Sequence, residues 1–239
     1  MTENREYYAR YEERYQKMYG AGIERWGHKD DDGLLCNVLK RWVDDYGLKG
    51  KSIIDFACGE GACGVILSKL GCRYHGVDIS KSAVMKTEES IKMYPQSRVS
   101  LMDMVKETTG EIYDAAVDSM GLHMLVTDSD RSNYLRNAYG SLKHGATMIF
   151  FREMYGEDSY SGVVDSFDMW KQIKGEDFEE LKLSCVVNGQ EIRYPILPAR
   201  GKTKADYYKE MESAGFTVEK FEVLPLNNNC SACIVVRKP

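Results

Sequence analysis

Short apolar runs alternate with amphipathic stretches through the middle of the chain. The apolar runs predict strands over residues 52–57, 74–77, 98–102, 113–117 and 146–151. Helical spacing of apolar positions falls around and between them, over residues 34–43, 62–70, 80–93 and 130–142. Strands that alternate with helices form a parallel sheet with helices on both faces. The pattern therefore predicts a doubly wound α/β fold.

Two departures from this rhythm lie towards the C-terminus. Residues 156–202 read as an insert with a β-hairpin, because Asn188-Gly189 separates two apolar runs and supplies the positive φ angles of a tight turn. A helix over 203–214 follows the insert. The final apolar runs, 217–224 and 230–237, are joined by a loop short enough for an antiparallel pair.

The first twenty residues carry tyrosines at a spacing of four, which predicts an amphipathic helix over residues 3–19 with one aromatic face. These tyrosines are Tyr7, Tyr11, Tyr15 and Tyr19. Such a stripe either packs the helix on the body of the protein or closes it over a ligand. A glycine-rich stretch with Trp26 and His28 follows.

Composition excludes several classes of protein. The 239 residues are 43% hydrophobic and 29% charged, which is typical of a globular protein. No apolar run approaches the roughly 18–20 residues of a membrane span, and the polar start has no apolar signal region, so we expect a cytoplasmic protein without a membrane partner. The net charge is −5 and basic residues do not cluster, which argues against nucleic acid as a partner.

The seven cysteines predict no metal site. Most lie in apolar contexts and are expected to be reduced thiols in the core. Cys230 and Cys233 have the C-x-x-C spacing, but they open an apolar strand and have neither a second pair nor a nearby histidine.

The candidate chemistry starts at the glycine loop after the first strand. Gly59-x-Gly61-x-x-Gly64 fits a nucleotide-binding turn, but Asp55 stands just ahead of it. A fixed carboxylate there repels a diphosphate and attracts a cation such as an ammonium or a sulfonium, both of which S-adenosylmethionine carries. Asp78, at the end of the second strand, suits the two hydroxyls of a ribose, or else it starts the helix before Ser80.

In these motifs the sequence resembles the class I S-adenosylmethionine-dependent methyltransferases. The resemblance covers residues 33–155 and 203–239 and rests on Asp55-x-x-x-Gly59-x-Gly61, Val77–Ser80, Met102–Met104, Tyr113–Met120 and Leu142–Gly145. It implies a Rossmann-like sheet of seven strands, mostly parallel, with the last strand antiparallel. It also implies that S-adenosylmethionine is the cofactor.

The resemblance implies a role for each matching position. Asp55 would hold the methionine ammonium, Asp78 the ribose, and Asp103 with Met104 the adenine, while Asp118 would line the pocket near the transferred methyl. The full set expected to contact the cofactor is Tyr19, Trp26, Asp55, Ala57, Cys58, Gly59, Gly61, Asp78, Ile79, Asp103, Met104 and Asp118.

The segment after Asp118 bears on the acceptor. It lacks the paired prolines that mark nucleic-acid amino methylases, and Leu122-His123 resembles the corresponding residues of small-molecule enzymes. His123, with an ordinary pKa of about 6.5, is the candidate general base, although a buried structural histidine is the alternative. Arg152 either grips a substrate carboxylate or forms a salt bridge. The expected catalytic residues are His123 and Asp118, and the expected substrate-binding residues are Tyr15, His28, His123 and Arg152.

We therefore expect a methyltransferase that modifies a nitrogen or oxygen, or a sulfur, of a small molecule. Residues 1–32 would form a helical lid, 33–155 with 203–239 the cofactor-binding core, and 156–202 a cap over the substrate site. A nicotinamide-dependent oxidoreductase and a non-catalytic cofactor-binding partner subunit stay as alternatives. A protein-methylating enzyme is a variant of the main hypothesis, and a homodimer stays open.

Overall fold

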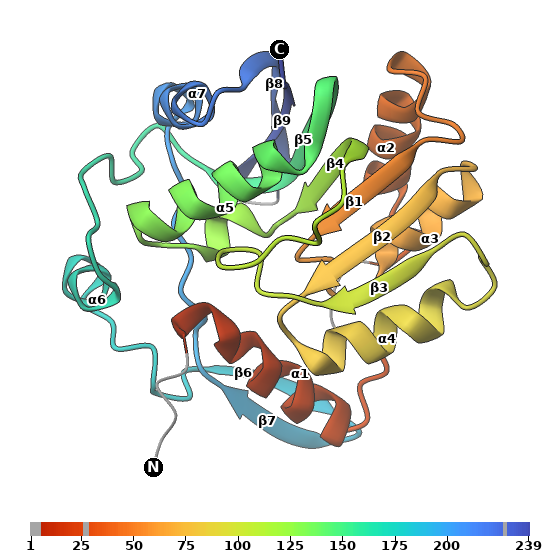
Figure 1. The fold of residues 1–239 in the computed structure, drawn as a ribbon. Coiled ribbons are helices and arrows are strands. Elements are labelled where there is room, and N and C mark those ends of the chain that lie inside the picture. Colours follow the sequence, from red (N-terminus) through yellow and green to blue (C-terminus); the bar gives the residue numbers. More distant parts are fainter. Residues whose placement is uncertain (1–5, 26–28, 227–228) are drawn as a thin grey trace.

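A single sheet organises the molecule. The computed structural model describes residues 6–25, 29–226 and 229–239, with a seven-stranded sheet in the order β3-β2-β1-β4-β5-β9-β8 (Figure 1). Its strands are β1 (Ser52–Phe56), β2 (Arg73–Asp78), β3 (Arg98–Leu101), β4 (Tyr113–Ser119), β5 (Leu142–Tyr155), β8 (Thr217–Leu226) and β9 (Asn229–Arg237). Strands β1 to β5 pair in parallel, and β9 is antiparallel to both of its neighbours. The predicted doubly wound, mostly parallel sheet is confirmed.

Helices cover both faces of the sheet, as the alternating pattern predicts. One apolar cluster joins the sheet to α2 (Gly33–Asp45), α3 (Ala62–Lys69) and α4 (Lys81–Ile91). The opposite cluster joins it to α5 (Asp128–Gly140) and α7 (Lys204–Ser213). Among the described residues, no helix is long and apolar enough to cross a membrane.

The starts of these helices are fixed by side-chain caps. Ser80, Thr127 and Thr203 each accept a hydrogen bond from a backbone N–H in the first turn of α4, α5 and α7. Such a cap stabilises a helix by about 1 kcal/mol. The α4 and α5 caps set where the chain leaves the carboxyl ends of β2 and β4, and thus the shape of the loops at that edge.

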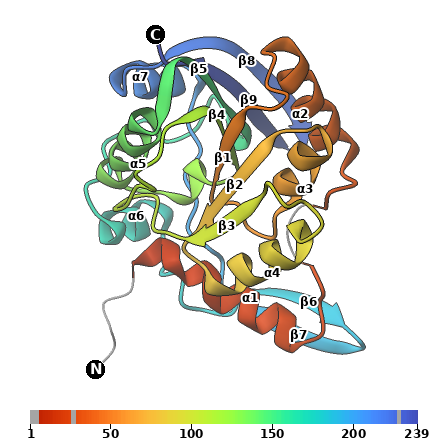
Figure 2. The same cartoon turned by 45° about the vertical axis from the view of Figure 1, so that its right-hand side comes forward.

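The N-terminal segment, Tyr7–Gly20, crosses this edge of the sheet. It consists of a 3-10 turn, η1 (Tyr7–Arg10), and the helix α1 (Tyr11–Gly20) (Figure 2). Glu12 docks it: this buried carboxylate accepts hydrogen bonds from Ser80 Oγ (2.6 Å), Ser82 N (3.0 Å) and Ser82 Oγ (2.8 Å) at the start of α4. Burial works against its charge, but these hydrogen bonds outweigh that effect and lower the pKa of Glu12.

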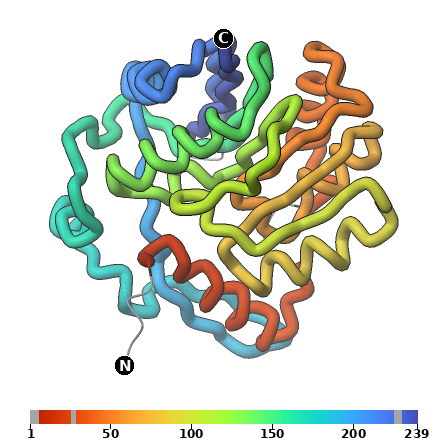
Figure 3. The backbone as a smooth tube through the Cα atoms, in the orientation of Figure 1, coloured from red at the N-terminus to blue at the C-terminus, as the bar shows by residue number. Residues whose placement is uncertain are grey.

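The insert leaves the sheet after β5 and runs along one side of the molecule before it returns to α7 (Figure 3). The predicted hairpin is present as β6 (Leu183–Val187) and β7 (Gln190–Tyr194), with positive φ angles of 50° at Asn188 and 78° at Gly189. The hairpin packs on α1, where Cys185 Sγ lies 4.0 Å from Met18 Sδ. A short helix, α6 (Phe167–Lys174), was not predicted, although Phe167, Trp170 and Ile173 recur at helical spacing and pack on the core.

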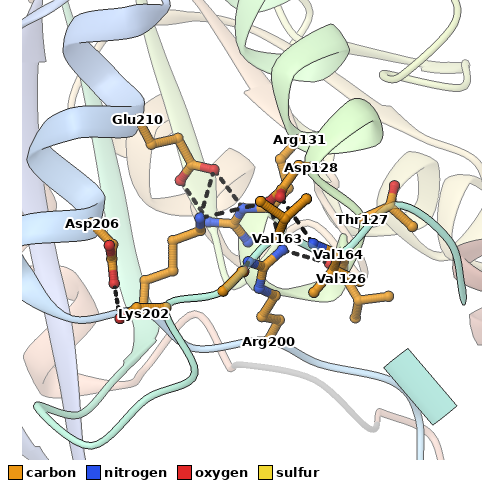
Figure 4. A network of polar contacts seen from close by, with 12 residues as sticks. Val126, Thr127, Asp128, Arg131, Val163, Val164, Arg200, Lys202, Asp206 and Glu210 are labelled. Atoms are coloured by element: carbon orange, nitrogen blue, oxygen red, sulfur yellow. Dashed lines mark hydrogen bonds and ion pairs between the residues drawn. The ribbon is translucent and has the colours of Figure 1, made fainter. Parts of the chain in front are cut away.

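A buried polar network joins the ends of the insert to α5 and α7 (Figure 4). Arg131 of α5 is fully buried and pairs with both oxygens of Glu210 on α7, each at 2.7 Å. Arg200, also buried, donates to Asp128 Oδ1 (2.6 Å) and to the carbonyl oxygen of Gly162 (2.8 Å). Arg131 also donates to the Leu122 and Leu125 carbonyl oxygens, so the network holds η2 (Leu122–Met124) at the end of β4.

Replacing Glu210 by glutamine is expected to destabilise the protein by roughly 3 kcal/mol, because it leaves the Arg131 guanidinium buried without its counter-charge. Chemical denaturation, compared with wild type, measures the loss. Glu212→Gln, an exposed position on the same helix, is the control and is expected to change the free energy of unfolding by less than about 0.5 kcal/mol. Equal effects of the two variants would contradict the assignment of Arg131–Glu210 as a structural pair.

Candidate functional site

A cavity of about 480 Å³ lies at the carboxyl edge of the parallel strands. The loops after β1, β2, β3 and β4 form its wall, and side chains of the N-terminal segment cover it. Ligand-binding pockets in proteins are typically about 300–1,000 Å³, and doubly wound sheets bind ligands at this edge. The cavity is therefore the candidate site.

The glycine loop forms one wall through backbone conformations that side chains disfavour. Ala57, Gly59 and Gly61 have φ angles of 52°, 54° and 80°. Ala57, Cys58 and Gly59 line the cavity. Gly61 lies outside the lining, and a Cβ there would meet the Thr87 Cγ2 methyl at 2.9 Å. The sequence predicts that Gly61 lets the backbone approach a ligand. In the structure, the absence of a side chain at Gly61 allows α3 and α4 to pack closely.

Asp55 is held at the base of the cavity by one tyrosine. Its carboxyl is buried and lines the cavity; Oδ2 accepts a hydrogen bond from Tyr74 Oη at 2.7 Å, and Oδ1 has no hydrogen-bond partner among the described residues. Burial raises the pKa of Asp55 to about 7; the Tyr74 hydrogen bond opposes the rise and the nearby Asp78 adds to it. A cation that reached Oδ1 would give this buried oxygen a partner and favour the ionised form.

The third glycine of the motif makes room for Tyr74. A Cβ on Gly64 would lie 2.7 Å from the Tyr74 ring, and a Cβ on Gly76 would lie 2.5 Å from the Tyr74 hydroxyl. Real Cβ contacts are not this short, so glycine is required at both positions. The glycines thus act on the site indirectly, by letting Tyr74 reach Asp55.

Asp78 connects the first two loops of the site. Its Oδ2 accepts from Gly59 N and its Oδ1 from Ser80 N, each at 2.8 Å, and it lines the cavity. The helix cap is Ser80 rather than Asp78, since Ser80 Oγ accepts from Ala83 N. Burial raises the pKa of Asp78 to about 6, against the lowering effect of its backbone hydrogen bonds.

The β3 loop brings Asp103 and Met104 to the cavity, with Met102, and Ile79 of the β2 loop lines it too. Asp103 Oδ1 accepts from Val105 N (2.9 Å), and Oδ2 accepts from Tyr8 Oη (3.1 Å). The two thioethers and Ile79 give this end of the cavity an apolar surface beside one carboxylate.

The N-terminal segment contributes more residues than the sequence analysis proposed. Tyr15 lines the cavity as expected, whereas Tyr19 stands behind it and donates to Glu60 Oε1 at 2.6 Å. Tyr8, Tyr11 and Arg14 line the cavity and were missed. The four-residue spacing of the tyrosines was the available signal, but it does not say which face meets a ligand.

Asp118 and His123 lie outside the cavity lining, contrary to expectation. Asp118 is fully buried, and its oxygens accept from Gly121 N and Tyr134 Oη, each at 2.6 Å. Burial, reinforced by Glu153, raises its pKa well above the ordinary value. His123 is also buried, with Nδ1 2.9 Å from Glu153 Oε2. Both side chains therefore shape the loop that follows β4 and do not face the cavity.

Arg152 also lies outside the cavity lining. It has a φ of 56° within an irregularity of β5, and its Nη1 lies 2.8 Å from Asp32 Oδ2. Because Asp32 caps α2, this ion pair fastens that helix to the sheet. Trp26 and His28, expected at the site, fall outside the described residues.

The loop after β4 adds lining residues that no motif predicted. They are Ser119, Met120, Gly121, Met124 and Leu125. Tyr11 of α1 contacts the Met124 sulfur through its hydroxyl. Across the described ranges, no group of three or more His, Cys, Asp or Glu side chains is placed to hold a metal ion.

Comparison of sequences places a known domain over this site. Residues 54–148 match the family model described as a methyltransferase domain. The ribosomal protein L11 methyltransferase of Alteromonas mediterranea is 40% identical over 53 residues, which is 22% of this chain and 18% of that protein. The chain thus matches only about a fifth of the length of the curated relatives.

Comparison of structures extends the likeness to the whole fold. The magnesium protoporphyrin IX methyltransferase of Synechocystis PCC 6803, solved with bound SAM, superposes with a TM-score of 0.65 over 100% of both chains at 14% identity. The 1,6-didemethyltoxoflavin-N1-methyltransferase of Burkholderia thailandensis gives a TM-score of 0.66 over 97% of this chain and 88% of that one, also at 14% identity. Residues 54–148 thus match a methyltransferase domain, and the whole chain has the fold of solved S-adenosylmethionine-dependent methyltransferases, as the resemblance in the sequence implied.

Proposed function

We propose that this protein transfers a methyl group from S-adenosylmethionine to a nitrogen, oxygen or sulfur of a small molecule. The observation that carries the proposal is the Asp55 carboxyl, which is buried at the base of the cavity with one oxygen lacking a partner among the described residues. A buried oxygen of this kind attracts a cation and repels a diphosphate. This supports a sulfonium nucleoside over a nicotinamide dinucleotide.

The remaining chemistry of the cavity fits the same cofactor. Asp55 would take the methionine ammonium, and Asp78 the ribose hydroxyls, because both carboxyl-bearing residues line the cavity. Met104 and Ile79 would pack on the adenine ring, with Asp103 beside its amino group. Bound in this way, S-adenosylmethionine supplies an electrophilic methyl group on a positively charged sulfur.

The protein's own part is to position and enclose the reactants. Methyl transfer is an in-line displacement, so its rate depends on how well the acceptor is aligned with the methyl group. The loop after β4, held by Asp118 and by Arg131, forms the wall nearest to the N-terminal segment. Tyr11 and Tyr15 cover the cavity from that segment and exclude water.

The cover of the cavity by the N-terminal segment favours a small acceptor over a protein or nucleic acid. This segment is fixed to the loops of the site by Glu12, Tyr8 and Tyr19, which limits the room for a side chain of a folded protein. None of the described residues of the insert lines the cavity. The insert instead contacts the N-terminal segment from outside, through Cys185 and Met18. We keep the cytoplasm as the proposed location, and a homodimer as an open arrangement.

The direct test is to incubate the protein with methyl-labelled S-adenosylmethionine and a library of small molecules, with ribosomal protein as a parallel acceptor. Labelled low-molecular-weight product supports the proposal. Tight binding of NAD in place of S-adenosylmethionine would support an oxidoreductase, and tight cofactor binding without any transfer would support a non-catalytic partner subunit.

Asp55→Asn is expected to weaken S-adenosylmethionine binding by roughly ten- to a hundredfold, since a hydrogen bond to a charged group contributes about 1.5–3 kcal/mol. Isothermal titration calorimetry measures the change. Asp114→Asn is the control. This carboxylate lies at the amino end of β4, away from the cavity at the carboxyl edge of the sheet, and pairs with Lys143 at 2.6 Å. Unchanged affinity in Asp55→Asn would remove Asp55 from the site.

Cofactor affinity is expected to rise between about pH 6 and pH 8, because Asp55 has a pKa of about 7 and binds an ammonium only when ionised. The effect on stability without ligand has the opposite sign. The folded-state pKa of Asp55 lies above its ordinary value of 3.8, so its ionisation lowers the stability of the fold as the pH rises from about 4 to about 7. Calorimetric titrations across this range test the rise. In Asp55→Asn the increase in cofactor affinity with pH that Asp55 causes should vanish. Only a smaller increase, from the ionisation of Asp78, should remain.

Tyr74→Phe is expected to raise the pKa of Asp55 further, because it removes the hydrogen bond that opposes the rise. Binding of S-adenosylmethionine should weaken several-fold at pH 7 and recover at about pH 8.5. Tyr46→Phe, whose hydroxyl bonds Glu219 on the surface, is the matched control and should bind as wild type at both pH values. A loss in Tyr74→Phe that does not depend on pH would contradict this role.

A further inference from the structure

The charged side chains that line the cavity come from different elements. The acidic ones, Asp55, Glu60, Asp78 and Asp103, lie at the ends of β1 and β2 and in the loops after β1 and β3. Arg14 is the cationic side chain among the described lining residues; it comes from α1, close to Tyr11, which contacts Met124 of the loop after β4. The proposed donor is positively charged and would bind beside the carboxylates. The part of the lining next to Arg14 and Tyr11 is then left for the acceptor.

This acceptor side is defined by Tyr11, Arg14, Ser119, Met120, Gly121, Met124 and Leu125. Its surface consists of an aromatic ring, two thioethers, a leucine side chain and a guanidinium. Aromatic and thioether groups pack well on flat, polarisable molecules. Leu125 is fully buried and Arg131 fixes its carbonyl oxygen, so this surface is held by the core.

Arg14 is positioned by the insert. Its guanidinium lies over the Tyr194 ring of β7, with the central carbon 4.7 Å from the ring centroid. A guanidinium stacked on an aromatic ring still presents its N–H edge to other partners, and that edge matches a carboxylate. The hairpin thereby affects the cavity without lining it.

The acceptor side offers no base. Among its described residues there is no histidine, aspartate or glutamate, and Tyr11 stays protonated because burial raises its pKa, with Arg14 lowering it only in part. An alkylammonium ion would have to lose a proton here and would also be repelled by Arg14. An acidic acceptor arrives already ionised and meets neither obstacle.

We propose that the acceptor is a flat, largely apolar molecule that carries a carboxylate or a similarly ionised acidic group, and that Arg14 pairs with that group. The inference rests on the proposed methyltransferase function. S-adenosylmethionine also carries a carboxylate, in its amino-acid part. The experiment therefore has to distinguish pairing of Arg14 with the acceptor from pairing of Arg14 with the donor.

Benzoate, benzamide and benzylamine are probes of similar size whose ring substituent is negative, neutral and positive; benzoate and benzamide are both planar and form the matched pair. Their binding to the protein saturated with S-adenosylhomocysteine is measured by calorimetry. Wild type is expected to bind benzoate at least about tenfold more tightly than the other two. Arg14→Met should abolish this preference and Arg14→Lys should retain part of it. Equal binding of the three probes, or a preference for benzylamine, overturns the proposal.

The second arm compares S-adenosylhomocysteine with 5′-methylthioadenosine, which lacks the amino-acid part. We expect Arg14→Met to leave the affinity of both nucleosides within about threefold of wild type. A loss of tenfold or more for S-adenosylhomocysteine alone assigns Arg14 to the donor's carboxylate and overturns the acceptor proposal. Failure of wild type to bind S-adenosylhomocysteine would instead contradict the proposed function.

Arg10→Met is the control for the charge change. Arg10 lies one helical turn before Arg14, pairs with Glu179 of the insert at 2.6 Å and does not line the cavity. It should keep the wild-type preference for benzoate. Thermal unfolding of each variant checks that the N-terminal segment remains docked; if Arg14→Met is unstable, the Arg14→Lys result decides.

Discussion

The site depends on one buried hydrogen bond, that from the Tyr74 hydroxyl to Asp55. A carboxyl placed beneath a loop in an apolar core tends to become protonated, and the pKa of Asp55 is raised to about 7 for this reason. Tyr74 satisfies one oxygen and leaves the other directed at the cavity. The room for Tyr74 comes from Gly64 and Gly76. The contact of Tyr74 with Asp55 thus explains two glycines that lie outside the cavity lining.

The sequence predicted the sheet well because its signals are local. Each parallel strand is a short apolar run followed by a cap or a glycine, and strands of this kind place their carboxyl ends at one edge. Asp55 and Asp78 could be assigned to that edge from their positions and Asp103 from the resemblance, and all three line the cavity. Helix α6 was missed although its apolar residues recur at helical spacing, because it spans only eight residues within an insert that was read for its hairpin.

Side-chain direction was harder to predict than position. His123 and Asp118 follow a strand in the right place, but their polar atoms are used by Glu153, Gly121 and Tyr134 inside the protein. Arg152 turns to Asp32 because β5 is irregular there, and an irregular strand leaves no mark in the polar pattern. The reverse holds for Tyr8, Tyr11 and Arg14, whose partners lie about a hundred residues away or more and become visible only after folding.

The docking of α1 joins parts of the chain that are far apart in sequence. Glu12 has its partners at Ser80 and Ser82 at the start of α4, and Arg14 stacks on Tyr194 of the inserted hairpin. The cover of the cavity is therefore complete only when both α4 and the hairpin are in place. Loosening either element would also loosen the tyrosines that α1 brings to the cavity.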